Sequence, residues 1–289
     1  MQLKQALAEA VLRFTAKNVP SPRMNAETLL MFTLSCDRAY LYAHSERELT
    51  ADEISRYEIA LSERIRGVPA QYITGHQEFW GMDLIVAPAV LIPRPETEHV
   101  IETVLDLANA RRNSGPPERR QNVRIIDVGT GSGCIALALA HELQQAEIHA
   151  ADISSAALEI AHLNAVRHQL DGRIHFREAD LLMGFEDSFF DFIVSNPPYV
   201  GVSEEDEVQL EVRRFEPRNA VFAGPTGLEI IARLIPQAHG ALRTGGWLVM
   251  EISGTIVKTV KQLLYGWAEV RVATDLQGIP RVVAARKVS

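Results

Sequence analysis

The chain has 289 residues, of which 47% are hydrophobic and 23% are charged, and its formal net charge is −8. This is the composition of an ordinary globular protein, and an acidic chain lacks the global field that attracts nucleic acid. Its apolar runs fall short of the roughly 20 residues that cross a bilayer, and the N-terminal segment lacks a signal-peptide core. With only two cysteines, Cys36 and Cys134, we expect a cytoplasmic protein with free thiols.

The first part of the chain, residues 1–67, has the pattern of a small helical domain. Apolar residues from Leu3 to Phe14 follow the spacing of one amphipathic helix face. A later helix is expected to begin at Thr50, where Glu53 completes a capping box, and to stop at Gly67. Nothing in this region indicates catalytic chemistry of its own.

Residues 68–93 change character and predict a linking hairpin. Short apolar strands flank Gly81 in "EFWGMDLIVAPAVLIP". Residues 94–289 then form the larger domain, which opens with an amphipathic helix in "RPETEHVIETVLDLANARR". The polar stretch "RRNSGPPERRQN" that follows is expected to be an exposed loop.

Strands and helices alternate regularly through the rest of the larger domain. The expected strands are "VRIIDVG", "EIHAADI", "IHFREAD", "FDFIVSN", "GGWLVMEIS", "EVRVATD" and "RVVAARK". Near-continuous apolar strands that alternate with helices predict an α/β fold, a mostly parallel, doubly wound sheet covered on both faces.

The turn after the first of these strands, "DVGTGSG" from Asp127 to Gly133, has the glycines of a ligand-binding turn. Its spacing differs from the dinucleotide fingerprint, and Asp127 suits a cationic ligand better than a pyrophosphate. Asp152 and Asp180 end the next two strands and so face the same rim. Three acids at one rim favour S-adenosylmethionine over NAD; the alternative is a structural turn whose acids only cap helices.

The motif Asn196-Pro197-Pro198-Tyr199 closes the fourth strand at the same rim. A planar nitrogen is a poor nucleophile, and an enzyme activates it by accepting hydrogen bonds from its N–H groups as it becomes tetrahedral. The Asn196 side-chain oxygen and the Pro197 carbonyl are two such acceptors, held by the prolines, and Tyr199 can pack over the planar group. Asn196, Pro197 and Tyr199 are the candidate catalytic residues. Without the glycine turn and the strand-end acids, the motif would also fit a rigid turn.

Together with "GVPAQYITGHQEFWG", "VLIPRPETEHVIE", "FEPRNAVFAGPTGLE" and "DLQGIPRVVAAR", these motifs make nearly the whole chain resemble the PrmC/HemK family. Members of this family are peptide chain release factor N5-glutamine methyltransferases with a class I, Rossmann-like, seven-stranded fold. The resemblance implies that Asn196, Pro197, Pro198 and Tyr199 hold the glutamine of the Gly-Gly-Gln motif in class-1 release factors. It implies S-adenosylmethionine contacts from Asp127, Gly129, Thr130, Gly131, Ser132, Gly133, Asp152, Ile153, Asp180, Leu181 and Asn196.

The resemblance also implies that the helical domain docks the release factor and that Arg94, Thr97 and Glu98 shape the wall beside the cofactor. We expect a monomer that needs no metal, binds no nucleic acid stably and does not enter a membrane. The segment "EISGTIVKTV" departs from the family pattern at the fifth strand end.

Two alternative functions remain at this point, and one acidic segment has two interpretations. The enzyme could methylate adenine N6 or guanine N2 in nucleic acid, although the chain has no basic groove or recognition insert for this. It could be a Rossmann-like binding protein without catalysis. The acidic residues 203–211 could be a solvated loop or could meet a basic face of the release factor.

Overall fold

A computed structural model describes residues 1–114 and 123–288, so most of the expected loop at 111–122 lies outside the described residues. The chain divides into two compact units. Residues Met1–His76 and Gln209–Phe215 form the first, and Gln77–Val208 and Glu216–Ser289 form the second. Within the described ranges, no helix has the length and apolar character needed to span a bilayer.

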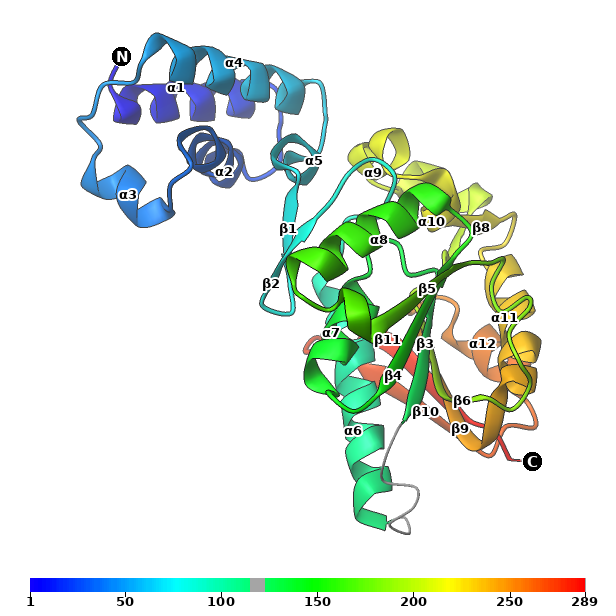
Figure 1. The fold of residues 1–289 in the computed structure, drawn as a ribbon. Helices are drawn as coiled ribbons and strands as arrows, with labels where there is room; N and C mark the ends of the chain where they lie inside the picture. The colour runs from blue at the N-terminus through cyan, green and yellow to red at the C-terminus, as the bar shows by residue number, and fades with distance from the viewer. Residues whose placement is uncertain (115–122, 289) are drawn as a thin grey trace. The chain divides into compact units, whose positions relative to one another are not determined.

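The first unit is helical, as the apolar periodicity of the N-terminal sequence predicts (Figure 1). Leu3, Ala6, Ala10 and Phe14 bury one face of the first helix. The Thr50 hydroxyl and the Glu53 carboxylate form the expected reciprocal capping box. The helices are α1 (Leu3–Ala16), α2 (Pro22–Leu34), α3 (Arg38–Ala43), α4 (Ala51–Ile65), α5 (Ala70–Thr74) and α9 (Leu210–Phe215).

Helix α9 joins this unit although it follows the Asn-Pro-Pro-Tyr motif in the chain. Arg64 of α4 is 3% exposed and donates to Glu211 of α9 at 2.5 Å. The same guanidinium donates to Asn25 and to the carbonyl of Val68. The ion pair therefore ties the short helix to the N-terminal bundle.

A hairpin follows the N-terminal helices, at the place where the sequence predicts one. Strands β1 (His76–Phe79) and β2 (Met82–Ile85) pair with each other. Trp80 and Gly81 occupy the turn with φ of 52° and 70°, which explains why glycine suits the second position.

The second unit is built on a seven-stranded sheet, and the predicted class I, Rossmann-like fold is confirmed. The strand order is β10-β11-β9-β6-β3-β4-β5, with β9, β6, β3, β4 and β5 parallel and β11 antiparallel to both neighbours. The strands are β3 (Arg124–Val128), β4 (Glu147–Asp152), β5 (Ile174–Glu178), β6 (Phe190–Ser195), β9 (Leu242–Glu251), β10 (Glu269–Thr274) and β11 (Pro280–Arg286).

Helices cover both faces of this sheet, with α6 and α7 on one side and α11 and α12 on the other (Figure 1). The helices are α6 (Glu98–Ser114), α7 (Cys134–Glu142), α8 (Ser155–Arg167), α10 (Arg218–Val221), α11 (Glu229–Ala241) and α12 (Val257–Leu263). Strands β7 (Val200–Gly201) and β8 (Phe222–Gly224) form a small separate pair.

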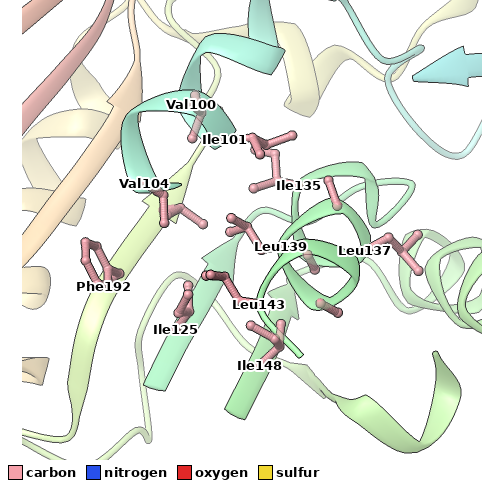
Figure 2. Close-up of a cluster of buried hydrophobic side chains, with 14 of the residues drawn as sticks. Val100, Ile101, Val104, Ile125, Ile135, Leu137, Leu139, Leu143, Ile148 and Phe192 are labelled. Atoms are coloured by element: carbon pink, nitrogen blue, oxygen red, sulfur yellow. The ribbon is translucent and has the colours of Figure 1, made fainter. Parts of the chain in front are cut away.

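The core lies in two layers because side chains alternate across each strand. In β3, Ile125 packs under α6 and α7, whereas Ile126 faces the layer of α11 and α12. Figure 2 shows the first layer, where Ile125, Ile148 and Phe192 of the sheet meet apolar residues of α6 and α7. These fully buried strands explain the near-continuous apolar runs in the sequence.

The chain order of the strands reverses beside β3. From β3 the chain adds β4 and β5 on one side, and it then crosses to place β6 on the other side. In open α/β sheets, ligands bind outside the carboxyl ends of the strands at such a reversal. The fold therefore positions the glycine turn after β3 and the Asn-Pro-Pro-Tyr motif after β6 next to each other.

Candidate active site

A cavity of about 250 Å³ opens at the carboxyl ends of the parallel strands, and all its lining residues belong to the second unit. Most of the predicted cofactor residues line it. They are Gly129, Thr130, Gly131, Ser132, Asp152, Ile153, Asp180, Leu181 and Asn196.

The glycine turn is fixed to the end of β4 by backbone hydrogen bonds. The N–H groups of Gly129 and Thr130 both donate to the carbonyl of Ala151, at 2.8 and 3.0 Å. The N–H of Gly131 donates to Asp152 Oδ2 at 2.9 Å. The turn and the acid after β4 thus form one rigid wall of the cavity.

The three glycines of the turn have different roles. Gly129 and Gly131 have φ of +73° and +56°, and a Cβ at either position would meet no atom within 4 Å. Gly133 lies behind the cavity, where a Cβ would come within 3.2 Å of the Cβ of Ala161 on α8. The first two therefore leave open space for a ligand, and the third permits close helix packing.

Asp127 lies beneath the turn and is 1% exposed. Its Oδ2 accepts hydrogen bonds from the Thr130 hydroxyl and the Ala136 N–H. Its Oδ1 is buried and has no hydrogen-bond partner among the described residues. Burial raises the pKa of this carboxyl to about 7, which the two hydrogen bonds only partly oppose. A cation near this carboxyl would relieve the cost of burying its charge.

The acids after β4 and β5 have different surroundings. Both oxygens of Asp152 accept backbone N–H groups, from Gly131 and Ser154, and burial raises its pKa. Asp180 lines the cavity but also forms an ion pair with Arg233 at 2.5 Å. Beside Asp152, the side chain of Ile153 is 58% exposed on the cavity wall and offers apolar contact area to a planar ligand.

The Asn-Pro-Pro-Tyr motif follows β6 directly, and Asn196 and Pro198 line the cavity. Pro197 and Tyr199 belong to the same loop but are not among the lining residues. The Tyr199 hydroxyl donates to Glu251 Oε1 at 3.1 Å, and burial is the main cause that raises the pKa of this phenol. The Asn196 amide donates through Nδ2 to the Thr97 hydroxyl at 3.0 Å.

Sequence reasoning did not name several residues that line the cavity. Two segments supply much of the additional wall, one before α6 and one at α10. Both segments resemble the family in sequence, but none of the additional lining residues in them is of a type or spacing that predicts ligand binding. Thr97 lines the cavity, whereas Arg94 pairs with Glu216 at 2.5 Å and Glu98 accepts the Trp80 N–H. The additional lining residues are Ala89, Val90, Leu91, Pro93, Cys134, Ile135, Ser154, Ala157, Ala179, Pro217, Asn219, Ala220 and Ile230.

The acidic stretch at 203–211 has contacts within the chain. Glu204 accepts the Gly201 N–H, and Glu205 pairs with Arg218 at 2.6 Å. Glu211, at the end of the stretch, pairs with Arg64. These carboxylates help hold the segment that connects the Asn-Pro-Pro-Tyr motif to α9.

Two family models match the chain. Residues 5–75 match the PrmC N-terminal domain, and residues 116–214 match the methyltransferase small domain. The two matches fall on the helical region and on the part of the sheet that carries both motifs.

Curated relatives match over almost the whole chain. A protein named release factor glutamine methyltransferase from Koribacter versatilis is 54% identical, with 99% of each chain covered. A protein of the same name from Moorella thermoacetica is 41% identical, with 99% of this chain and 98% of the relative covered.

Solved structures share the fold at low sequence identity. The catalytic domain of hMettl16 in complex with MAT2A 3′UTR hairpin 6 has a TM-score of 0.57 at 18% identity. The alignment covers 88% of this chain and 95% of that domain. A methyltransferase from Pyrococcus furiosus has a TM-score of 0.51 at 16% identity, covering 72% of this chain and 90% of that one.

Proposed function

The chain belongs to the release factor glutamine methyltransferase family, and we propose that it methylates the glutamine side chain in the Gly-Gly-Gln motif of class-1 release factors. The methyl acceptor would be the amide nitrogen N5, and the donor would be S-adenosylmethionine. The single observation that carries this proposal is the position of Asn196 and Pro198 on the wall of the cavity that the glycine turn also lines.

The residues present fit S-adenosylmethionine. Gly129 and Gly131 leave the space where their Cβ atoms would project, which lets a ligand approach the backbone. The buried Oδ1 of Asp127, which no described residue engages in a hydrogen bond, suits a ligand that carries positive charge. The buried carboxylate of Asp152 suits ribose hydroxyls. The exposed side chain of Ile153 suits the face of an adenine ring.

We propose that the full cofactor set is the one expected from the sequence. In this set Asp127 and Gly133 would act from behind the wall, and the others would contact the ligand. When bound, S-adenosylmethionine supplies an electrophilic methyl group on a sulfonium.

The protein's own contribution is to prepare an amide nitrogen whose lone pair is delocalised. The Asn196 side-chain oxygen and the Pro197 carbonyl would accept the two N–H groups of the glutamine. Those hydrogen bonds strengthen as the nitrogen becomes tetrahedral, so they stabilise the transition state more than the bound substrate. Tyr199 would pack over the amide plane and orient it. A strong base is unnecessary, because the methylated nitrogen is acidic and loses its proton readily.

A nucleic-acid amino-methyltransferase needs the same nitrogen chemistry but has less support. The likeness to the RNA-bound hMettl16 domain, at 18% identity, concerns the fold alone. The chain carries a net charge of −8, which repels a phosphate backbone unless a local basic surface compensates.

The substrate protein itself would be recognised outside the cavity. We infer that the N-terminal helical unit helps dock the release factor, and that the enzyme acts as a monomer in the cytoplasm, where translation terminates.

The test is a methyl-transfer assay with labelled S-adenosylmethionine on three substrates: a class-1 release factor, its Gly-Gly-Ala variant, and nucleic acid. We expect label on the release factor with an intact Gly-Gly-Gln motif, and none on the Gly-Gly-Ala variant or on nucleic acid. Label on nucleic acid but not on the release factor would overturn the proposal.

A further inference from the structure

A line of hydrogen bonds that starts at the cavity wall joins three segments that are far apart in the chain. Asn196 Nδ2 donates to Thr97 Oγ1 at 3.0 Å, and Thr97 Oγ1 donates to Glu251 Oε2 at 2.6 Å. Asn196 follows β6, Thr97 ends the short 3-10 helix Pro95–Thr97, and Glu251 ends β9. The line ends on Glu251, the first residue of the segment "EISGTIVKTV", to which the sequence assigned no role.

The direction of these bonds follows from what each group can donate. With Glu251 ionised, its carboxylate only accepts hydrogen bonds, so the Thr97 hydroxyl donates its one proton to Glu251 Oε2. The Thr97 oxygen can then only accept from Asn196, which must present its NH₂ group rather than its carbonyl. The amide of Asn196 is thereby fixed in one of its two orientations. Within the described residues, no hydrogen bond engages its Oδ1.

Burial makes this arrangement rigid. Thr97 is 1% exposed and Glu251 is 3% exposed, so water does not compete for their hydrogen bonds. The other oxygen of Glu251 accepts from the Tyr199 hydroxyl. Burial raises the pKa of Glu251, as does the charge of Glu96, whereas the two hydroxyl donors and the charge of Arg281 favour the ionised form.

We propose that Glu251 and Thr97 are positioning residues that orient the Asn196 amide, so that its oxygen rather than its nitrogen is available to the substrate. The proposal rests on the proposed function, in which that oxygen accepts a glutamine N–H. A flipped Asn196 amide would turn its NH₂ group towards the glutamine N–H, which is also a donor. The substrate amide would then lose one of its two hydrogen-bond acceptors. Glu251 also accepts a hydrogen bond from the Tyr199 hydroxyl. One carboxylate therefore orients two residues of the motif, Tyr199 directly and Asn196 through Thr97.

The decisive variants change the polarity at Thr97 with little change in volume. Thr97→Val removes the hydroxyl, so the Asn196 amide loses the partner that selects its orientation. We expect kcat to fall by about tenfold to a hundredfold, because misorienting one preorganised group costs most of its contribution. Thr97→Ser restores the hydroxyl and should recover most of kcat. The Kd for S-adenosylmethionine should change by no more than a few-fold in either variant, since the glycine turn and the strand-end acids would keep most of the proposed cofactor contacts.

A matched control is available in the N-terminal unit. The Thr33 hydroxyl is also buried, with the residue 3% exposed, and donates to the Leu29 carbonyl at 2.7 Å. Thr33→Val removes a buried hydroxyl of the same kind, so it should lower stability without lowering kcat. This separates a general loss of stability from a loss of orientation.

The experiment measures kcat on the release factor, cofactor Kd by calorimetry, and thermal unfolding for the wild type and the three variants. A selective loss of kcat in Thr97→Val, with recovery in Thr97→Ser, supports the positioning role. If the wild type is active and a folded Thr97→Val enzyme has normal kcat, the positioning role is overturned while the proposed function stands. An equal loss of kcat in Thr97→Val and Thr97→Ser overturns the positioning role as well. A wild type that methylates no release factor overturns the proposed function itself.

Discussion

Ser195, the last residue of β6, donates its hydroxyl to the carbonyl of Val128, the last residue of β3, at 2.7 Å. Both residues are buried, and the bond closes the ladder that pairs Val194 with Asp127. The Asn-Pro-Pro-Tyr motif and the glycine turn therefore leave the sheet at a fixed offset from each other. This offset lets two motifs far apart in the sequence share one cavity.

The loop after the motif depends on a glycine that lies elsewhere in the chain. Gly227 has φ of +80°, and a Cβ there would come within 2.5 Å of the Tyr199 carbonyl oxygen. Gly227→Ala must therefore displace the backbone at Tyr199. We expect a loss of kcat of about tenfold or more, because the acceptor loop shifts by a fraction of an ångström. Steady-state kinetics on the release factor would measure it.

Gly245→Ala is the matched control. Gly245 has φ of +79°, but a Cβ there would meet nothing within 4 Å. Both variants carry the same backbone strain, about 1–2 kcal/mol, so both should lose similar stability from that source. Only Gly227→Ala should lose activity beyond this. Equal activity in the two variants would contradict a dependence of the motif on Gly227.

The buried carboxyl of Asp127 predicts a pH dependence of stability. Its pKa rises from 3.8 to about 7 in the folded protein, so between these values the folded state holds a proton that the unfolded state has lost. Its contribution to stability is therefore complete below pH 3.8 and is lost as the pH rises through about 7. The loss amounts to a few kcal/mol.

Chemical denaturation of the wild type and Asp127→Asn across this pH range measures the contribution. The Asn variant lacks the titrating group, so its stability should fall less steeply than that of the wild type. The comparison uses the slope with pH, because the new amide can also change stability at every pH. Parallel slopes in the two proteins would show that Asp127 is ionised throughout.

The ion pair between Arg64 and Glu211 predicts a local effect on the N-terminal unit. Glu211→Ala leaves a guanidinium 3% exposed without its carboxylate, which should cost about 1–3 kcal/mol. Amide hydrogen exchange of α4 and α9 would detect the loss. The pair of Arg13 and Glu58, whose side chains are 32% and 44% exposed, offers the control, because Glu58→Ala should cost about 1 kcal/mol or less. Equal protection of α9 in both variants would argue against this tether.

The sheet and much of the cavity could be predicted because their signals are local. The central strands β3 and β6 are short, buried apolar runs, and parallel strands bring their carboxyl ends to one rim. That geometry is enough to bring the turn at Gly129, the acid at Asp152 and Asn196 to one cavity. Local signals also predicted the capping box at Thr50.

The rest depends on contacts between residues that are distant in the sequence. Thr97 and Glu251 are 154 positions apart, and neither has a spacing pattern that indicates the other. Likewise, α9 is a short amphipathic segment whose sequence does not specify which helices it packs against. Tertiary packing decides such contacts, so only the folded structure brings Glu251 to the back of the motif.

The acceptor role that we propose for Asn196 predicts a separation between cofactor binding and turnover. Asn196→Ala removes one of two acceptors for the glutamine amide, which should lower kcat by about 10²–10³-fold. The Kd for S-adenosylmethionine should change by only a few-fold, since in the proposed site most of the cofactor contacts would come from the glycine turn and the strand-end acids. Near-normal kcat in this variant would show that the acceptor role is wrong.

The most direct test of the account is to locate the methyl group itself. A class-1 release factor is incubated with the enzyme and S-adenosylmethionine, and the peptide that contains Gly-Gly-Gln is fragmented in a mass spectrometer. We expect one methyl group on the glutamine side-chain amide with the wild type, and almost none with Asn196→Ala at the same incubation time. A methyl group on another residue, or an unmodified release factor, would contradict it.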